Sequence, residues 1–268
     1  MSAESRIPDF QKPIDHAVLC ETVRLYTARY PFLRVVGVGR SILGREIPAL
    51  VLGGGRRQLL YAEARGYGIV MPSAEGVLLE KPEMFKQGSR YGVRLKAKGE
   101  FCEYYKSGRT VYRVPLPTFW ERYTLHIIPM LNPDGVEYQI HGVKRENPLY
   151  ARVIGMNGGK SDFSHWQANA RGVDLNHNYD AGFAEYKAME TELGIPDGAP
   201  TRYSGQEPES EPEVRALCSY IRFLDGVRLV AAFHTQGEVI YYRSGGKSLP
   251  GGYEAALKVA KLTGYRLA

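Results

Sequence analysis

The sequence predicts an α/β protein built on a mixed, mostly parallel twisted sheet flanked by helices. Two observations carry this prediction. Short apolar runs of the kind that form buried strands recur along the chain, and segments with helical periodicity separate several of them. Apolar strands that alternate with helices are typical of a sheet covered on both faces. The four runs are residues 58–62, 124–131, 227–234 and 238–242.

The N-terminal part of the chain predicts a helix followed by a hairpin. Within residues 18–30 the apolar side chains recur at mostly helical spacings, and Pro31 ends the pattern. The β-branched run 33–39 then predicts a strand. Residues 42–52, which contain a Gly-Arg turn, predict the other arm of a hairpin.

The second half of the chain adds two helices and one marked turn. Helical periodicity runs through residues 211–224 and again through residues 253–262. The sequence Asn132-Pro-Asp-Gly135 directly follows the apolar run 124–131 and is a strong turn signal. These elements complete the predicted alternation of strands and helices.

Composition excludes several classes of protein. The chain has 268 residues, 44% of them apolar and 24% charged, which is the mix of a globular protein and not of a disordered or coiled-coil chain. A net charge of +6 without a long basic block does not indicate nucleic-acid binding. Residues 1–20 contain no apolar signal region, and no stretch reaches 18 apolar residues. We therefore expect a cytoplasmic protein with no membrane or nucleic-acid partner.

Residues 66–99 interrupt this organisation. The segment shows alternating polarity, Gly-Ser and Gly-Tyr turns and several lysines, whereas strand and helix patterns alternate on either side of it. It predicts small β-hairpins, and we interpret it as an insert that is foreign to the surrounding domain.

Three patterns of catalytic or ligand-binding proteins are incomplete or absent. Residues 155–161 are one residue short of a phosphate-binding loop. Residues 174–185 match five calcium-loop positions but carry Tyr179 where the loop needs glycine. The chain has no G-x-S-x-G motif, so a serine hydrolase is not supported.

The residues most suggestive of chemistry lie in the second half. His234 ends an apolar strand, and ligands of α/β sheets bind outside the carboxyl ends of strands. Upstream, one turn contains Arg171, Asn176 and His177, whose guanidinium, amide and imidazole groups suit a carboxylate or carbonyl oxygen. A surface histidine and an Asn-rich turn bonded to its own backbone remain the alternative interpretations.

Six motifs agree in order and spacing with one known family. They are Tyr30-Pro31, Gly37-x-Gly-Arg-Ser-x-x-Gly-Arg45, Leu131-Asn-Pro-Asp-Gly135, Asn169-Ala-Arg-Gly-Val-Asp-Leu-Asn176, Pro208-Glu-Ser-Glu-Pro-Glu213 and Phe233-His-Thr-Gln-Gly237. The chain resembles zinc metallocarboxypeptidases of the carboxypeptidase A type, and within them the bacterial enzymes that cut γ-D-glutamyl–diamino acid bonds of cell-wall peptides. The resemblance implies an incomplete metallocarboxypeptidase-like domain at residues 1–65 and 100–268, with the foreign β-rich segment at residues 66–99.

The resemblance assigns roles to four residues. His234 matches the family's late zinc-binding histidine, and Asn176 matches the amide that holds the substrate's terminal carboxylate. His177 stands where the family has the main arginine partner of that carboxylate, which puts the preference for a free C-terminus in doubt. The position of the transition-state arginine holds Gln167, and Arg171 is the nearest substitute and therefore the candidate catalytic residue.

The resemblance also implies that the zinc machinery is incomplete. The family's H-x-x-E motif belongs where this chain reads Ala64-Arg-Gly-Tyr-Gly68, so His234 is the one recognisable ligand for a Zn²⁺ cofactor. The family's general-base glutamate lies beyond the helix that residues 253–262 resemble, whereas this sequence ends at Ala268. We therefore expect a domain truncated at its C-terminus.

Residues 66–99 in turn resemble part of the C-terminal region of stage IV sporulation protein A, which suggests a fusion of two genes. The family activity is zinc-dependent hydrolysis of peptide or γ-glutamyl amide bonds in cell-wall peptides, and a peptide or muropeptide is the expected partner. We expect this chain to be inactive or nearly so. The alternatives are a non-catalytic peptide-binding module and an inactive fusion fragment.

Overall fold

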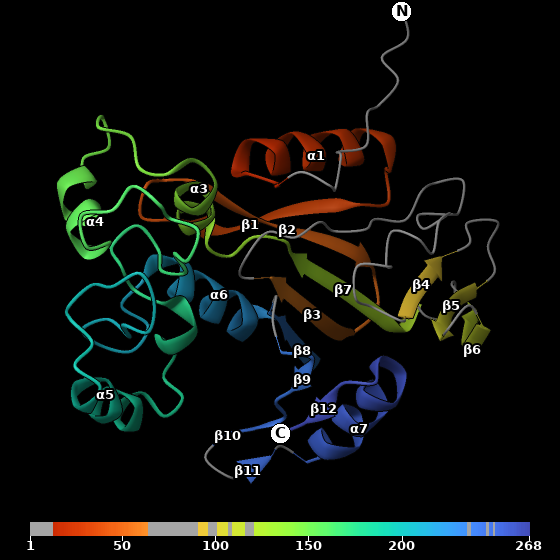
Figure 1. The fold of residues 1–268 in the computed structure, drawn as a ribbon. Helices are drawn as coiled ribbons and strands as arrows, with labels where there is room; N and C mark the ends of the chain where they lie inside the picture. Colours follow the sequence, from red (N-terminus) through yellow and green to blue (C-terminus); the bar gives the residue numbers. More distant parts are fainter. Residues whose placement is uncertain are drawn as a thin grey trace, which may run out of the picture.

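The computed structural model describes residues 13–63, 91–95, 101–106, 109–115, 121–234, 237–244, 247–248 and 250–268 (Figure 1). The helices are α1 (His16–Arg29), α3 (Pro133–His141), α4 (Tyr150–Met156), η2 (Leu175–His177), α5 (Phe183–Glu192), α6 (Pro212–Phe223) and α7 (Gly252–Thr263). The strands are β1 (Arg34–Arg40), β2 (Glu46–Gly53), β3 (Arg57–Glu63), β4 (Tyr91–Leu95), β5 (Phe101–Lys106), β6 (Arg109–Pro115), β7 (Tyr123–Ile128), β8 (Val227–Phe233), β9 (Val239–Ile240), β10 (Arg243–Ser244), β11 (Lys247–Ser248) and β12 (Arg266–Leu267).

A five-stranded mixed sheet in the order β1-β2-β7-β3-β8 forms the centre of the fold. β1 and β2 are the predicted antiparallel hairpin, β2 pairs with β7 antiparallel, and β7, β3 and β8 are parallel neighbours. Four of the five strands therefore run in one direction, and β2 alone opposes them. The predicted α/β class and mixed sheet are confirmed.

Helices cover both faces of this sheet. Because successive side chains of a strand point to opposite faces, β2 contributes to two separate cores. Leu50 and Leu52 pack with α1 in one buried cluster, and Ile47 and Ala49 pack with α6 in the other. Figure 1 shows α1 lying along the sheet beside β1 and β2. The alternating side chains of β2, buried on both faces, thus place α1 and α6 on opposite sides of the sheet.

The predicted turn at residues 132–135 is instead the start of a helix. Asn132 is the N-cap of α3, and its Oδ1 accepts a hydrogen bond from the Gly135 N–H at 3.0 Å. Pro133 occupies the first helical turn, where its missing N–H costs nothing. Asn-Pro-Asp-Gly suits both a turn and a capped helix, and the residues that follow decided between them.

Apart from η2 and α5, the residues between α4 and α6 form irregular chain held by buried polar side chains. The Asn178 Nδ2 group donates to the carbonyl oxygens of Ser204 and Glu207, and its Oδ1 accepts from the Glu211 N–H. Asn178 is fully buried, and its side chain satisfies backbone groups that have no partner in a regular helix or sheet. They fix the loop that carries η2.

The strands β4, β5 and β6 form a separate three-stranded antiparallel sheet. β4 is the one part of the predicted insert at residues 66–99 that the structure describes, and it pairs with β5 beyond the predicted boundary. Near the C-terminus, the predicted strand 238–242 is reduced to the two residues of β9, which pair with β12. Within the described ranges, no helix has the length and apolar character needed to cross a bilayer.

Candidate functional site

A pocket of about 460 Å³ opens beside η2 and the end of β8. It is formed by residues from six separate parts of the chain, and it brings together three of the four predicted site residues. Its lining consists of Asn132, Gln167, Asp174, Leu175, Asn176, His177, Ile195, Thr201, Arg202 and His234.

Asp174 organises the wall of the pocket that η2 supplies. It is buried and caps η2, and its Oδ1 accepts from the Asn176 N–H at 3.3 Å. Its Oδ2 accepts from the Arg202 N–H at 3.0 Å and from the Thr201 hydroxyl at 3.3 Å. This carboxylate therefore ties η2 to residues 201–202. Its bonds position Asn176 at the pocket, where the amide is exposed.

His177 lies partly buried in the same wall. Its ring stacks on Tyr186 of α5, and its Nε2 is 3.9 Å from Asp174 Oδ2. Burial lowers the pKa of His177, and the nearby Arg202 cation lowers it further, against the opposing effect of the Asp174 and Glu190 carboxylates. The imidazole is therefore neutral at pH 7, which makes it a weaker partner for an anion than an arginine.

His234 reaches the pocket from the carboxyl end of β8. The residue before it, Phe233, pairs in register with Glu63 at the end of β3. The two parallel strands therefore end side by side, as expected for a ligand site at the carboxyl ends of the strands. His234 is exposed at this edge and lines the pocket. Ala64–Gly68, where the sequence departs from the H-x-x-E motif, follow Glu63 and lie outside the described residues.

The structure places Arg171 away from the pocket lining. Its Nη2 is 3.0 Å from Glu211 Oε2, which also accepts from the Asn169 Nδ2 group at 2.6 Å. The Glu211 side chain is 4% exposed, and Arg171 is its charge partner. These contacts give Arg171 a structural role, since it neutralises the buried Glu211 carboxylate at the start of α6. Its catalytic role stays a prediction.

Sequence reasoning missed Arg202, which lines the pocket and whose cation lies near His177. Arg202 has a positive φ of 70°, an uncommon conformation for a residue other than glycine. Its N–H bond to Asp174 holds that backbone geometry. No local motif marks this residue, because it reaches the site through packing between segments 28 residues apart.

The described pocket residues do not by themselves fit a catalytic zinc ion. Such an ion takes three protein ligands and a water molecule. His177 and His234 each offer a ring nitrogen, but Asp174 is occupied by three donors, and these residues do not form a group of three ligating side chains close enough to share an ion. Within the described part of the chain, the one group of three ligating side chains close enough to share an ion lies elsewhere, at Asp15, Glu137 and His141.

The family that these features indicate is confirmed by comparison with known proteins. The zinc carboxypeptidase family profile matches residues 101–266, well over half of the sequence. The chain belongs to the zinc carboxypeptidase family. The family, described as zinc carboxypeptidases, implies a Zn²⁺ cofactor.

Its relatives include a bacterial endopeptidase and mammalian carboxypeptidases. The γ-D-glutamyl-L-diamino acid endopeptidase 1 of Lysinibacillus sphaericus is 25% identical over 97% of this chain and 60% of its own length. Human mast cell carboxypeptidase A is 27% identical over 60% of this chain and 36% of its own. The chain thus spans 60% or less of the length of these relatives.

Solved structures agree with the fold. The carboxypeptidase A of Helicoverpa armigera superposes with a TM-score of 0.57 at 17% identity, over 97% of this chain and 56% of the insect protein. This likeness concerns the fold.

The expected likeness to stage IV sporulation protein A is also found. The stage IV sporulation protein A of Clostridioides difficile is 54% identical over 39 residues, which is 15% of this chain. The matching profile covers residues 56–106 and describes the middle domain of that protein, so the expected likeness to its C-terminal region was wrong. The match begins just before the strand run 58–62 and extends past the predicted end of the insert at residue 99.

Proposed function

We propose that the pocket beside η2 binds the free carboxylate of a cell-wall peptide. The observation that carries the proposal is the presence of Arg202 in a lining that also contains Asn176 and His177. A guanidinium and an amide are strong hydrogen-bond donors to a carboxylate, and Arg202 would supply the charge that a neutral His177 lacks.

The substrate class is supported by the relatives. The Lysinibacillus protein, similar over nearly the whole chain, is named for cleaving γ-D-glutamyl-L-diamino acid bonds. Peptides with such bonds carry several free carboxylates, which suits a pocket with cationic and amide lining. A muropeptide is therefore the proposed ligand.

Zinc-dependent hydrolysis of peptide or γ-glutamyl amide bonds is the second candidate, supported by membership of the family. We propose that the chain as given hydrolyses these bonds slowly or not at all. His234 would be its zinc ligand, and the described lining offers no complete ligand set around it. The alternative of an inactive fusion fragment predicts neither binding nor hydrolysis.

Calorimetric titration of the purified chain with a muropeptide tests the binding proposal. The same peptide with its terminal carboxylate converted to a carboxamide is the matched control ligand. We expect the carboxylate to bind at least tenfold more tightly and Arg202→Gln to remove most of that difference, because charged hydrogen bonds contribute about 1.5–3 kcal/mol. Equal affinity for the two peptides would contradict the proposal.

Incubation of the chain with muropeptide and zinc, followed by mass spectrometry of the products, tests hydrolysis. We expect no cleavage above the rate of a His234→Ala control. Cleavage that depends on both zinc and His234 would show that residues outside the described lining complete the site.

A further inference from the structure

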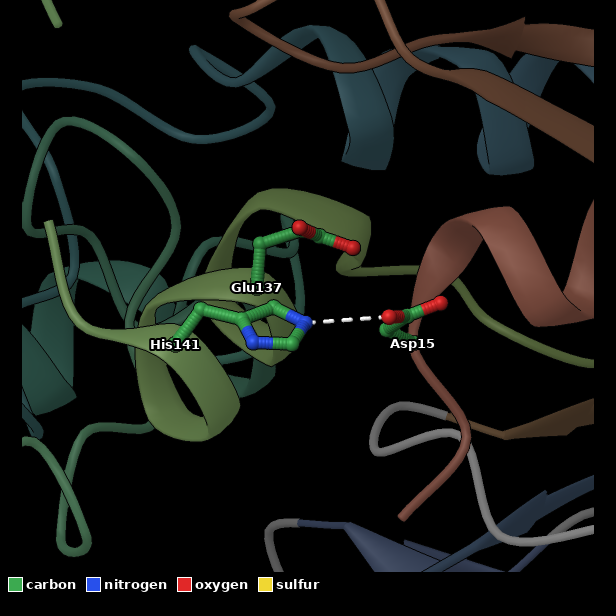
Figure 2. A group of neighbouring side chains, drawn as sticks. All are labelled: Asp15, Glu137 and His141. Carbon is green, nitrogen blue, oxygen red and sulfur yellow. Dashed lines mark hydrogen bonds and ion pairs between the residues drawn. The ribbon is translucent and has the colours of Figure 1, made fainter. Parts of the chain in front are cut away.

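Three metal-ligating side chains meet between α1 and α3. Asp15, Glu137 and His141 each place a ligand atom within 4.8 Å of the other two, and Figure 2 shows the side chains facing one another. We propose that this group binds a divalent transition-metal ion, zinc or one of similar ligand preference, with water in the remaining positions. This proposal does not rest on the function proposed for the pocket.

Backbone donors of α1 fix both carboxylates. Asp15 is the N-cap of α1, and its Oδ1 accepts from the Val18 N–H at 2.9 Å. Glu137 Oε1 accepts from the His16 N–H, also at 2.9 Å. Each carboxylate is thus held through one oxygen and keeps a second oxygen. A metal ligand whose orientation is set by a second hydrogen bond loses little freedom on binding.

His141 completes the group from the end of α3. It follows Glu137 by four residues, so both side chains lie on the same face of the helix. Its Nε2 is 2.9 Å from Asp15 Oδ2 (Figure 2). The His141 side chain is 45% exposed, compared with 22% for Asp15 and 20% for Glu137. The group is therefore shielded on the carboxylate side and open to water beside the imidazole.

The donor set points to a zinc-like ion. Magnesium and calcium prefer shells of oxygen ligands, whereas one imidazole with two carboxylates suits zinc and its first-row neighbours. Zinc–nitrogen and zinc–oxygen bonds of about 2.0–2.2 Å place ligand atoms about 3.3 Å apart in a tetrahedron. Ligand atoms that already lie within 4.8 Å can reach this arrangement by small side-chain rotations.

One cation lies close to the group. Arg45 Nη2 is 3.8 Å from Glu137 Oε2. The other terminal nitrogen of Arg45 pairs with the fully buried Asp134, so its charge is shared with a carboxylate outside the group. The shared charge of Arg45 offsets only part of the charge of the Asp15 and Glu137 carboxylates. The group therefore keeps excess negative charge, which a divalent ion would neutralise.

The proposed site is separate from the pocket. Asn132, which lines the pocket, caps the start of α3, and His141 is the last residue of that helix. Nine residues of helix separate these positions by about 13 Å along the axis. An ion at the proposed site would join α1 to α3, and it would add to any zinc held by His234.

Metal analysis of the tag-free chain tests the proposal. The protein would be stripped with a chelator, dialysed against micromolar zinc, and assayed by elemental mass spectrometry and by thermal unfolding. Asp15→Asn and Glu137→Gln keep the hydrogen bonds from Val18 and His16 while removing charge. His141→Ala removes the nitrogen ligand, and exposed His165→Ala is the matched control for a surface histidine.

We expect wild type, His165→Ala and His234→Ala to bind one zinc ion that raises the melting temperature. We expect His141→Ala to lose that ion, and Glu137→Gln and Asp15→Asn to bind it roughly tenfold or more weakly. Three outcomes would overturn the proposal: no zinc on the wild type, unchanged zinc on His141→Ala, or zinc lost from His234→Ala instead. Cobalt substitution gives an independent readout, since visible absorption bands should depend on His141.

Discussion

The imidazole of His177 lies flat against the ring of Tyr186, with the ring centroids 4.0 Å apart and the planes inclined by 8°. The contact joins η2 to α5 and holds the imidazole at the wall of the pocket. Stacking fixes the plane of the ring at this wall, so the protonation state of His177 decides what the pocket can bind there.

Carboxylate binding should strengthen as the pH falls. Burial lowers the pKa of His177, so the imidazole is neutral at pH 7.5 and gains its charge only on acidification below its usual range of about 6.5. We expect a muropeptide to bind more tightly at pH 5.5 than at pH 7.5, with calorimetry as the measurement. His177→Arg should bind equally well at both values, and His177→Ala should bind weakly at both.

The same shift has a consequence for stability. The unfolded chain takes up a proton on this histidine at higher pH than the folded chain, so the free energy of unfolding should fall as the pH drops below about 6.5. His177→Ala should remove this contribution. For the binding prediction, a pH dependence of muropeptide affinity that persists in His177→Ala would mean that another titrating group causes it.

Removing Arg171 should destabilise the fold more than it weakens peptide binding. Arg171→Ala leaves the buried Glu211 carboxylate without its charge partner, which costs about 1–3 kcal/mol. Combining it with Glu211→Gln should recover part of the loss, because the uncompensated charge is then absent. Urea unfolding measures these changes. Normal stability with abolished binding or catalysis in Arg171→Ala would instead support its predicted catalytic role.

Glu213 should make the protein more stable in mild acid. The side chain is fully buried, and burial together with the nearby Asp134 carboxylate raises its pKa to about 7, against hydrogen bonds from the Ile42 N–H and Asn169. An unfolded glutamate titrates near 4.3, so the folded state binds the proton more tightly. Its contribution to stability is therefore complete below about pH 4.3 and declines as the pH rises toward 7, by about 3 kcal/mol.

Denaturation of Glu213→Gln across pH 4.5 to 7.5 tests this expectation. The variant carries a neutral side chain of the same shape, so its stability should lack this decline. Equal pH profiles for Glu213→Gln and the wild type would show that Glu213 titrates normally.

Gly55 and Gly54 should differ sharply in their tolerance of a methyl group. A Cβ at Gly55 would lie 2.0 Å from the backbone carbon of Arg122, whereas a Cβ at Gly54 would meet no atom within 4 Å. Because the obstacle is backbone, Gly55→Ala must move the chain next to β7, at a cost of about 1–3 kcal/mol. Gly54→Ala should change stability little. Thermal unfolding of the two variants compares the sites, and equal melting temperatures would contradict the close approach.

Much of the fold was predictable from local pattern. The hairpin of β1 and β2, the strands β3, β7 and β8, and the helices α1, α6 and α7 all follow from residue spacing, because the faces of a strand or helix repeat with a fixed period. The expected burial of β8 was wrong, because β8 is an edge strand whose side chains are mostly exposed. The start of α3 was misjudged, since Asn132-Pro133 satisfies the rules for a turn and for a helix cap alike.

The sequence by itself determined the α/β class. It also singled out Asn176, His177 and His234 as candidate site residues, because each stands in a local motif or ends a recognisable strand. The tertiary structure alone decided that Arg202 joins the pocket while Arg171 pairs with Glu211. Packing likewise brings Asp15 to His141 across 126 residues. The reason is physical: side-chain spacing encodes which face of an element is buried, but the contacts between distant segments depend on how all those faces pack together.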